Sequence, residues 1–116
     1  MNILITLFLN ALALLATAYL VPGFKVDSFT TALLAAIVLG VINTFVKPIL
    51  TIITLPINFL TLGLFTFVIN AVVLYLTTLV VPGFMIDGML TAILGAIVLS
   101  IVSTILSHLA KELKLK

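Results

Sequence analysis

The sequence has no cysteine and very few charged residues. The absence of cysteine excludes disulfide bonds and thiolate metal sites. Only 7% of the 116 residues are charged and 65% are hydrophobic, whereas a soluble domain is about 25% charged. Five basic and three acidic residues cannot cover the surface of a water-soluble protein of this size, so the chain is expected in a lipid bilayer.

The same scarcity argues against an enzyme and against nucleic-acid binding. Apart from the lysines, the ionisable side chains are Asp27, Asp87, Glu112 and His108, and no two carboxylates are close in sequence. We therefore predict no catalytic site, no metal site and no cofactor. A net charge of +2 is too small for a nucleic-acid-binding surface. No apolar segment carries a charge near its middle, so the usual marks of proton-coupled transport are missing.

An internal repeat is the strongest pattern in the chain. Residues 10–46 align without a gap with residues 70–106, with 17 identities in 37 positions. The string V-P-G-F occurs at 21–24 and again at 81–84. Apolar composition alone does not place Pro, Gly and Phe in register. The repeat predicts two copies of one unit, each a pair of hydrophobic helices around a V-P-G-F turn.

Four apolar segments are long enough to cross a bilayer, which takes about 20 residues. The segment 47–56 between the second and third is too short to span, and Pro48 and Pro56 each remove a backbone donor there. We predict an all-α integral membrane protein with four transmembrane helices, as two parallel helical-hairpin repeats with a short proline-bracketed interfacial or re-entrant segment between them. The four segments cover about residues 3–21, 29–46, 57–81 and 89–110.

The whole chain is expected to form a single membrane domain. Its predicted parts are repeat one (3–46), a connection (47–56), repeat two (57–110) and a basic tail (111–116). An alternative is that the first segment is a signal peptide, because Ala16-Thr17-Ala18 resembles a cleavage site. The missing basic n-region and the match to the internal third segment favour retention of this segment.

The placement of the lysines predicts the orientation. With four spans, Lys47 and the lysines of the tail fall on one side of the membrane, and Lys25 falls on the other. This places both termini in the cytoplasm and both V-P-G-F turns outside. The two hairpins then enter from the same side and are related by an axis along the membrane normal. If residues 49–56 cross the membrane, the repeats are inverted instead.

Each V-P-G-F turn is predicted to end one helix and to begin the next. The proline stops the preceding helix, the glycine permits backbone angles that other residues avoid, and the phenylalanine is expected at headgroup depth. The aspartate that follows is placed where an N-cap belongs. An alternative is that the two aspartates form a cation-attracting mouth. The outer-turn residues are Pro22, Gly23, Asp27, Pro82, Gly83 and Asp87.

Small residues recur every four positions along the second and fourth segments. Such spacing places them on one helix face, where they let helices approach closely in lipid. We predict a packing face, which joins either the two halves or two subunits. Its members are Ala32, Ala36, Gly40, Ala92, Ala96 and Ser100.

Asparagines lie inside the first and third segments. Asn10 and Asn70 are each followed seven residues later by a threonine, Thr17 and Thr77, on nearly the same helix face. Because a polar amide in hydrocarbon is costly unless it is bonded, these side chains either bond across the two-fold axis or line a water path. Four further residues mark the cytoplasmic connection: Asn43, Lys47, Pro48 and Pro56.

The string G-V-I-N-T-F-V-K-P-I-L at 40–50, followed by L-P at 55–56 and T-L-G-L-F at 61–65, resembles the YvlD-like membrane proteins, phage holin family 4, superfamily IV. The likeness covers nearly the whole chain. It implies a four-span, multi-pass protein of the bacterial cytoplasmic (inner) membrane. Some members are encoded with envelope-stress proteins, which implies a role in membrane integrity and a membrane-stress protein as partner.

Two functions follow as expectations. The first is a holin-like protein that forms an oligomeric pore or permeabilising assembly, lined by the asparagines and threonines. The alternative is a non-conducting structural or adaptor protein that binds lipid or a partner in envelope stress. We expect homo-oligomers, because a chain this short encloses little. A selective ion channel ranks lower, because the sequence has no charged filter ring.

Overall fold

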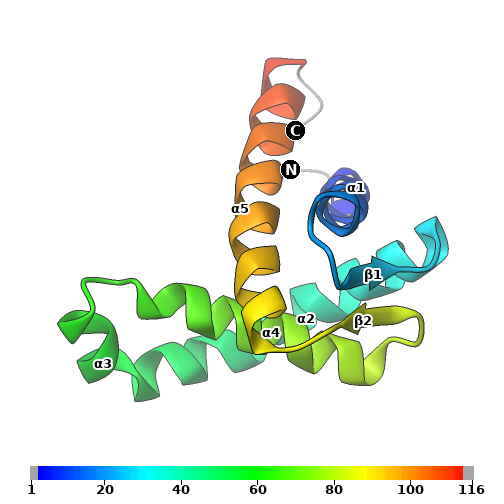
Figure 1. Ribbon diagram of the computed structural model, residues 1–116. Helices are drawn as coiled ribbons and strands as arrows, with labels where there is room; N and C mark the ends of the chain where they lie inside the picture. Colours follow the sequence, from blue (N-terminus) through cyan, green and yellow to red (C-terminus); the bar gives the residue numbers. More distant parts are fainter. Residues whose placement is uncertain (1–2, 114–116) are drawn as a thin grey trace.

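The computed structural model describes residues 3–113 as long helices joined at one end by a small β-ribbon (Figure 1). Lys114 and Lys116 of the predicted basic tail lie outside the described residues. In chain order the elements are α1 (Ile3–Leu20), β1 (Phe24–Val26), α2 (Phe29–Ile53), α3 (Leu55–Leu60), α4 (Phe65–Val80), β2 (Phe84–Ile86) and α5 (Met89–Glu112).

The prediction of an all-helical membrane fold is confirmed. By length and composition, α1, α2 and α5 are able to cross a membrane, and α4 is a shorter apolar helix. With 16 residues, α4 is about 24 Å long, less than the hydrocarbon core of about 30 Å. The third predicted span, 57–81, is therefore not one helix in the structure.

The third span is divided because α3 ends in a Schellman motif. The N–H of Gly63 donates to the carbonyl of Asn58 at 2.8 Å, and the N–H of Leu62 donates to that of Phe59 at 3.2 Å. Leu62 and Gly63 have φ angles of 59° and 89°, in the left-handed region that ends helices. The motif redirects the chain before α4 begins.

Helix α2 continues through Pro48, so the prediction that the second helix ends near residue 46 and gives way to a separate connection is wrong. A proline removes one donor, and within a membrane helix neighbouring side chains can bond the carbonyls it affects. The carbonyl that loses its helical donor is that of Thr44, four residues before Pro48. Pro56 lies in the first turn of α3, where its missing N–H would have no intrahelical partner in any case.

The strands β1 and β2 pair antiparallel and join the two hairpins. Next to the strands, the N–H of Asp27 donates to the carbonyl of Gly83 at 3.1 Å, and the N–H of Asp87 donates to that of Gly23 at 3.0 Å. Positions 60 residues apart thus make matching bonds. The paired residues are Phe24 with Ile86, Lys25 with Met85 and Val26 with Phe84.

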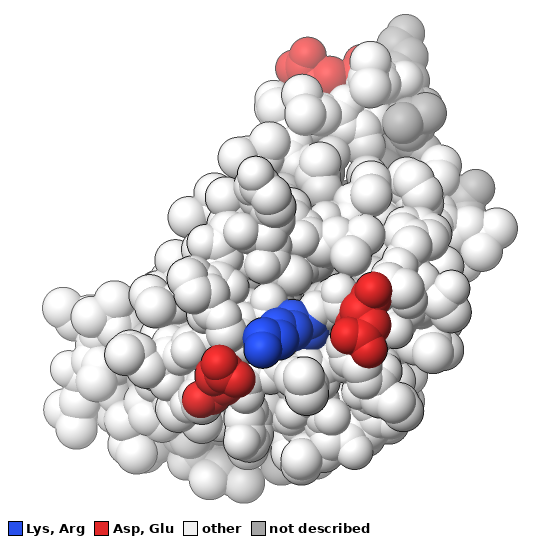
Figure 2. Space-filling view, turned by 45° about the vertical axis from the view of Figure 1, so that its right-hand side comes forward, with Lys and Arg blue, Asp and Glu red and all other residues white. Residues whose placement is uncertain are grey.

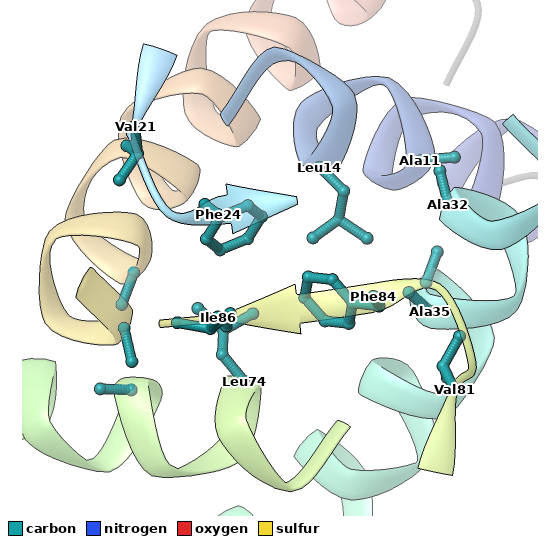
Figure 3. Close-up of a cluster of buried hydrophobic side chains, with 14 residues drawn as sticks. Ala11, Leu14, Val21, Phe24, Ala32, Ala35, Leu74, Val81, Phe84 and Ile86 are labelled. Atoms are coloured by element: carbon teal, nitrogen blue, oxygen red, sulfur yellow. The ribbon is translucent and has the colours of Figure 1, made fainter. Parts of the chain in front are cut away.

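Phe24 and Phe84 form the centre of the core. Their ring centroids lie 5.3 Å apart at an interplanar angle of 62°, and each side chain is 1% exposed. Figure 3 shows the two rings facing one another beside Leu14 and Leu74. Alternate residues of a strand point to opposite sides, and both phenylalanines take the inward side. That the rings lie at headgroup depth stays a prediction.

The N-cap role predicted for the two aspartates is also wrong. The cap of α2 is Ser28, whose Oγ accepts from the N–H of Thr31 at 3.2 Å, and the cap of α5 is Gly88. The ribbon bonds instead carry each aspartate across to the other hairpin. A Cβ added to Gly83 would lie 2.8 Å from Oδ2 of Asp27.

Helices α1 and α4 each pack against both α2 and α5. In each predicted small-residue stripe, the first two members are buried and the third is exposed. Ala32, Ala36, Ala92 and Ala96 are at most 2% exposed, whereas Gly40 and Ser100 are exposed. Within residues 3–113, α2 and α5 do not pack on each other. Figure 1 shows α5 rising away from α2, α3 and α4.

Two helical glycines make a matched test of core packing. A Cβ at Gly95 would lie 2.6 Å from Cδ2 of the buried Phe24 ring, whereas one at Gly40 meets nothing within 4 Å. Alanine raises helix propensity similarly at both sites, by up to about 1 kcal/mol, and overpacking costs about 1–3 kcal/mol. Gly95→Ala should therefore unfold more easily than Gly40→Ala by about that overpacking cost, measured by SDS titration in mixed micelles with circular dichroism. Equal stabilities would contradict the packing of Phe24 on α5.

A second pair of glycines tests the contact across the ribbon. Gly83 and Gly63 have φ angles of 87° and 89°, but only Gly83 faces a neighbouring side chain, that of Asp27. Alanine at either site costs about 1–2 kcal/mol of backbone strain. Gly83→Ala should lose a further amount of about 1 kcal/mol or more from overpacking, in the same unfolding assay. If the two variants are equally stable, the aspartate does not press on the opposite turn.

Candidate functional site

A groove with a volume of about 200 Å³ is lined by residues of all four long helices, α1, α2, α4 and α5. Half of its lining side chains are polar, although the surrounding helices are strongly apolar. We call it the polar groove. Its polar residues are Asn10, Asn43, Lys47, Asn70, Ser100 and Ser103, and its other residues are Leu39, Gly40, Val73, Leu74, Ala96 and Leu99.

The structure brings Asn10 and Asn70 into this one groove from α1 and α4. Both side chains are partly buried. Within the described residues neither side-chain amide makes a hydrogen bond, so the structure does not show the predicted bond between the two across the axis. Lining of a polar path remains as the other predicted role. The amides are left to bond water, lipid or another chain.

Thr17 and Thr77 lie outside the polar groove. Both are fully buried, and their hydroxyls donate to the carbonyls of Ala13 and Val73 within their own helices, at 2.8 and 2.9 Å. Seven residues return to nearly the same helix face, but they also advance about 10 Å along the axis. That step carries the threonines from the groove into the core beside the ribbon.

Four polar residues of the groove were not predicted to line it, and two of these, Asn43 and Lys47, were assigned to the cytoplasmic connection. Ser100 was assigned, together with Gly40, to helix packing, and Ser103 was not singled out. Ser103 lies 60 residues after Asn43, so the internal repeat carried the signal that the two share a role. The structure places these residues opposite one another, on the walls that α2 and α5 contribute.

The charge of the polar groove comes from one side chain. Lys47 is partly buried, and it is the only charged residue among those that line the groove. The equivalent position on α5, residue 107, is a serine. Among residues 3–113, Lys47 makes no ion pair, and the ion pair between His108 and Glu112, at 3.4 Å, lies on exposed side chains of α5. The groove is therefore positive at one end.

Three further charges lie at the ribbon. Lys25 is the central residue of β1, and Asp27 and Asp87 each follow a strand. Figure 2 shows a basic patch between two acidic patches on a largely uncharged face, with a further acidic patch at the top. Among the residues described, no group of three or more His, Cys, Asp or Glu side chains is placed to hold a metal ion.

Apolar helices of spanning length around a groove of amides and hydroxyls define a small multi-pass membrane protein in contact with the lipid bilayer. The family model described as mycobacterial 4 TMS phage holin, superfamily IV, matches residues 1–105, and the chain belongs to this family. It is accordingly a bacterial membrane protein.

Two relatives are similar over most of their length. The uncharacterized membrane protein YvlD of Bacillus subtilis is 38% identical over 98 residues, which cover 84% of this chain and 82% of the relative. The uncharacterized protein SCO3922 of Streptomyces coelicolor is 39% identical over 112 residues, which cover 88% of this chain and 90% of the relative. No solved structure matches the chain significantly.

The polar groove should be hydrated, and the absence of native cysteine makes this testable. A thiol reacts with maleimide as its thiolate, which forms in water and is excluded from hydrocarbon. In liposomes, Asn43→Cys and Ser103→Cys should react rapidly with a water-soluble maleimide. Ile37→Cys, at a side chain that is 46% exposed outside the groove, and Thr17→Cys, in the core, should react far more slowly. Equal rates at Asn43→Cys and Ile37→Cys would show that the groove is filled by hydrocarbon.

Proposed function

We propose that the chain is a holin-like protein of the bacterial inner membrane that assembles into homo-oligomers and permeabilises the bilayer along the polar groove. One observation carries this proposal: Asn10, Asn43 and Asn70 meet in one groove without a hydrogen-bond partner among the described residues. An unsatisfied polar group in hydrocarbon costs several kcal/mol. Water in a path between subunits would satisfy these amides. The role is non-enzymatic.

The proposed orientation places both termini in the cytoplasm, with the chain folded as two parallel hairpin repeats. The matching ribbon bonds between positions 60 residues apart support a two-fold axis perpendicular to the ribbon. An axis of this kind, along the membrane normal, makes both hairpins enter from the same side. Lys47 then lies at the cytoplasmic surface, in agreement with the positive-inside rule.

A second function is a non-conducting structural or adaptor role. It is supported by the buried core residues that line part of the polar groove. Its lining includes Val73 and Leu74, and Leu74 belongs to the same buried cluster as the two packed phenylalanine rings. A single chain therefore holds a closed recess on this side of the core. In this role the protein would bind lipid or a membrane-stress protein partner without leakage.

Efflux from sealed liposomes separates the two functions. Vesicles loaded with potassium and a small dye are prepared across a series of protein-to-lipid ratios. An assembled pore releases both solutes, and the leak rises steeply with protein density. Release of potassium alone indicates a selective channel, and tight vesicles with inserted, folded protein support the non-conducting role.

The groove residues are tested in the same vesicles. The double variant Asn10→Leu/Asn70→Leu should abolish the leak while insertion is kept, because the path loses its polar lining. The matched control is Thr30→Leu, since Thr30 is exposed outside the groove and the equivalent position 90 already holds leucine. A leak that persists unchanged in the double variant rules out these asparagines as lining residues.

A further inference from the structure

We propose that each chain binds one anionic phospholipid, with the lipid phosphate in the polar groove beside Lys47 and an acyl chain in an apolar groove next to it. This inference concerns the occupant of the groove in a single chain, and it does not depend on leakage. It rests on the proposed orientation only for the choice of leaflet.

The polar groove is suited to a phosphate diester because it offers several hydrogen-bond donors, one positive charge and no negative charge. Three side-chain amides, two serine hydroxyls and one ammonium group line it, and among the residues described their side chains make no hydrogen bonds with one another. A phosphate diester offers only acceptor oxygens and carries one negative charge. No acidic side chain lies in the lining, so nothing repels an anion, and the ammonium group of Lys47 disfavours a metal cation.

The apolar groove lies directly beside the polar one. Its volume is about 410 Å³, and Ser100 lines both grooves. A ligand that fills the two is therefore an amphiphile with a polar head and a long apolar chain. This feature favours a lipid over free phosphate. The apolar groove runs along α4 and α5 and is lined by Phe67, Ile97, Ser100, Ile101, Thr104 and Ile105.

The position of Lys47 along α2 matches the depth of a lipid phosphate. Lys47 lies 18 residues after Phe29, the first residue of α2 at the ribbon end, and hence roughly 27 Å along the helix axis. The hydrocarbon core is about 30 Å thick. The charge thus lies near the membrane boundary opposite to the ribbon, while the amides of Asn10 and Asn70 reach deeper. Headgroups meet hydrocarbon at this level.

The binding site is single although the fold is repeated. Residue 107, the counterpart of Lys47, is a serine, and the counterpart of Asn43 is Ser103. One wall of the groove therefore carries the charge and an amide, and the other carries hydroxyls. This asymmetry predicts one tightly bound anionic lipid for each chain, with the phosphate nearer to α2.

Native mass spectrometry of the detergent-solubilised full chain tests the proposal. Phosphatidylglycerol is titrated and compared with phosphatidylethanolamine of the same acyl chains. The first phosphatidylglycerol should bind more tightly than phosphatidylethanolamine. Lys47→Gln should weaken it about fivefold, because one lysine near a lipid surface contributes about 1 kcal/mol. The matched control Lys25→Gln, at the ribbon, should leave the affinity unchanged.

A second variant and a headgroup analogue make the test conclusive even if Lys47→Gln does not fold. If Lys47→Gln does not fold, Asn43→Leu replaces it, which keeps the charge and removes one donor a helical turn away from Lys47; weaker binding of phosphatidylglycerol than in the unaltered chain again supports the site. Equal affinities for the two lipids, or equal losses in Lys47→Gln and Lys25→Gln, overturn the proposal. Glycerol phosphate is titrated as the headgroup alone. If it displaces phosphatidylglycerol at an equal concentration, the ligand is a free phosphate ester and the lipid proposal fails.

Discussion

The pairing of β1 with β2 is the constraint on which the rest of the molecule depends. Helices gain little from hydrophobic burial in a bilayer, because lipid tails are as apolar as leucine. Backbone hydrogen bonds without competing water are a stronger tie, and here they join the hairpins at one end only. That tie presses Phe24 against Phe84 and closes the ribbon end. Among residues 3–113, neither α2 and α5 nor α1 and α4 contact each other, and the polar groove lies among these four helices.

The polar groove is the structural feature that connects this chain to the membrane activities expected of its family. A closed helical bundle in lipid satisfies its polar groups internally, whereas this chain exposes several donors in one recess. Such a recess has to be filled by water, by another copy or by headgroups. A permeabilising assembly and a lipid-binding protein therefore use the same structural feature. Which occupant prevails depends on the oligomeric state and on the lipids around the chain.

The sequence predicted the apolar helices, the turns with left-handed glycines and the meeting of Asn10 with Asn70. It failed where the outcome depended on contacts between distant segments. A three-residue strand leaves no clear pattern in the sequence, so the turn predicts a cap at Asp27 and gives no sign that Phe24 packs on Phe84. From the sequence, Pro48 is predicted to end the helix, because a proline removes one backbone donor. In a bilayer the helix is favoured nevertheless, because the other backbone groups have no water to bond. The groove depends on how the four long helices pack around it, and local sequence patterns do not determine that packing.

The register of the ribbon bears on how such a repeated chain arises. Lys25 lies directly opposite Met85, on the axis that relates the two hairpins. If a hairpin with the first sequence paired with an identical copy of itself, two lysines would face each other there, and like charges directly opposite are destabilising. Methionine facing methionine carries no such penalty. When the two units are joined in one polypeptide, the two central positions of the ribbon need not be identical, so a single lysine can lie there without facing a second one.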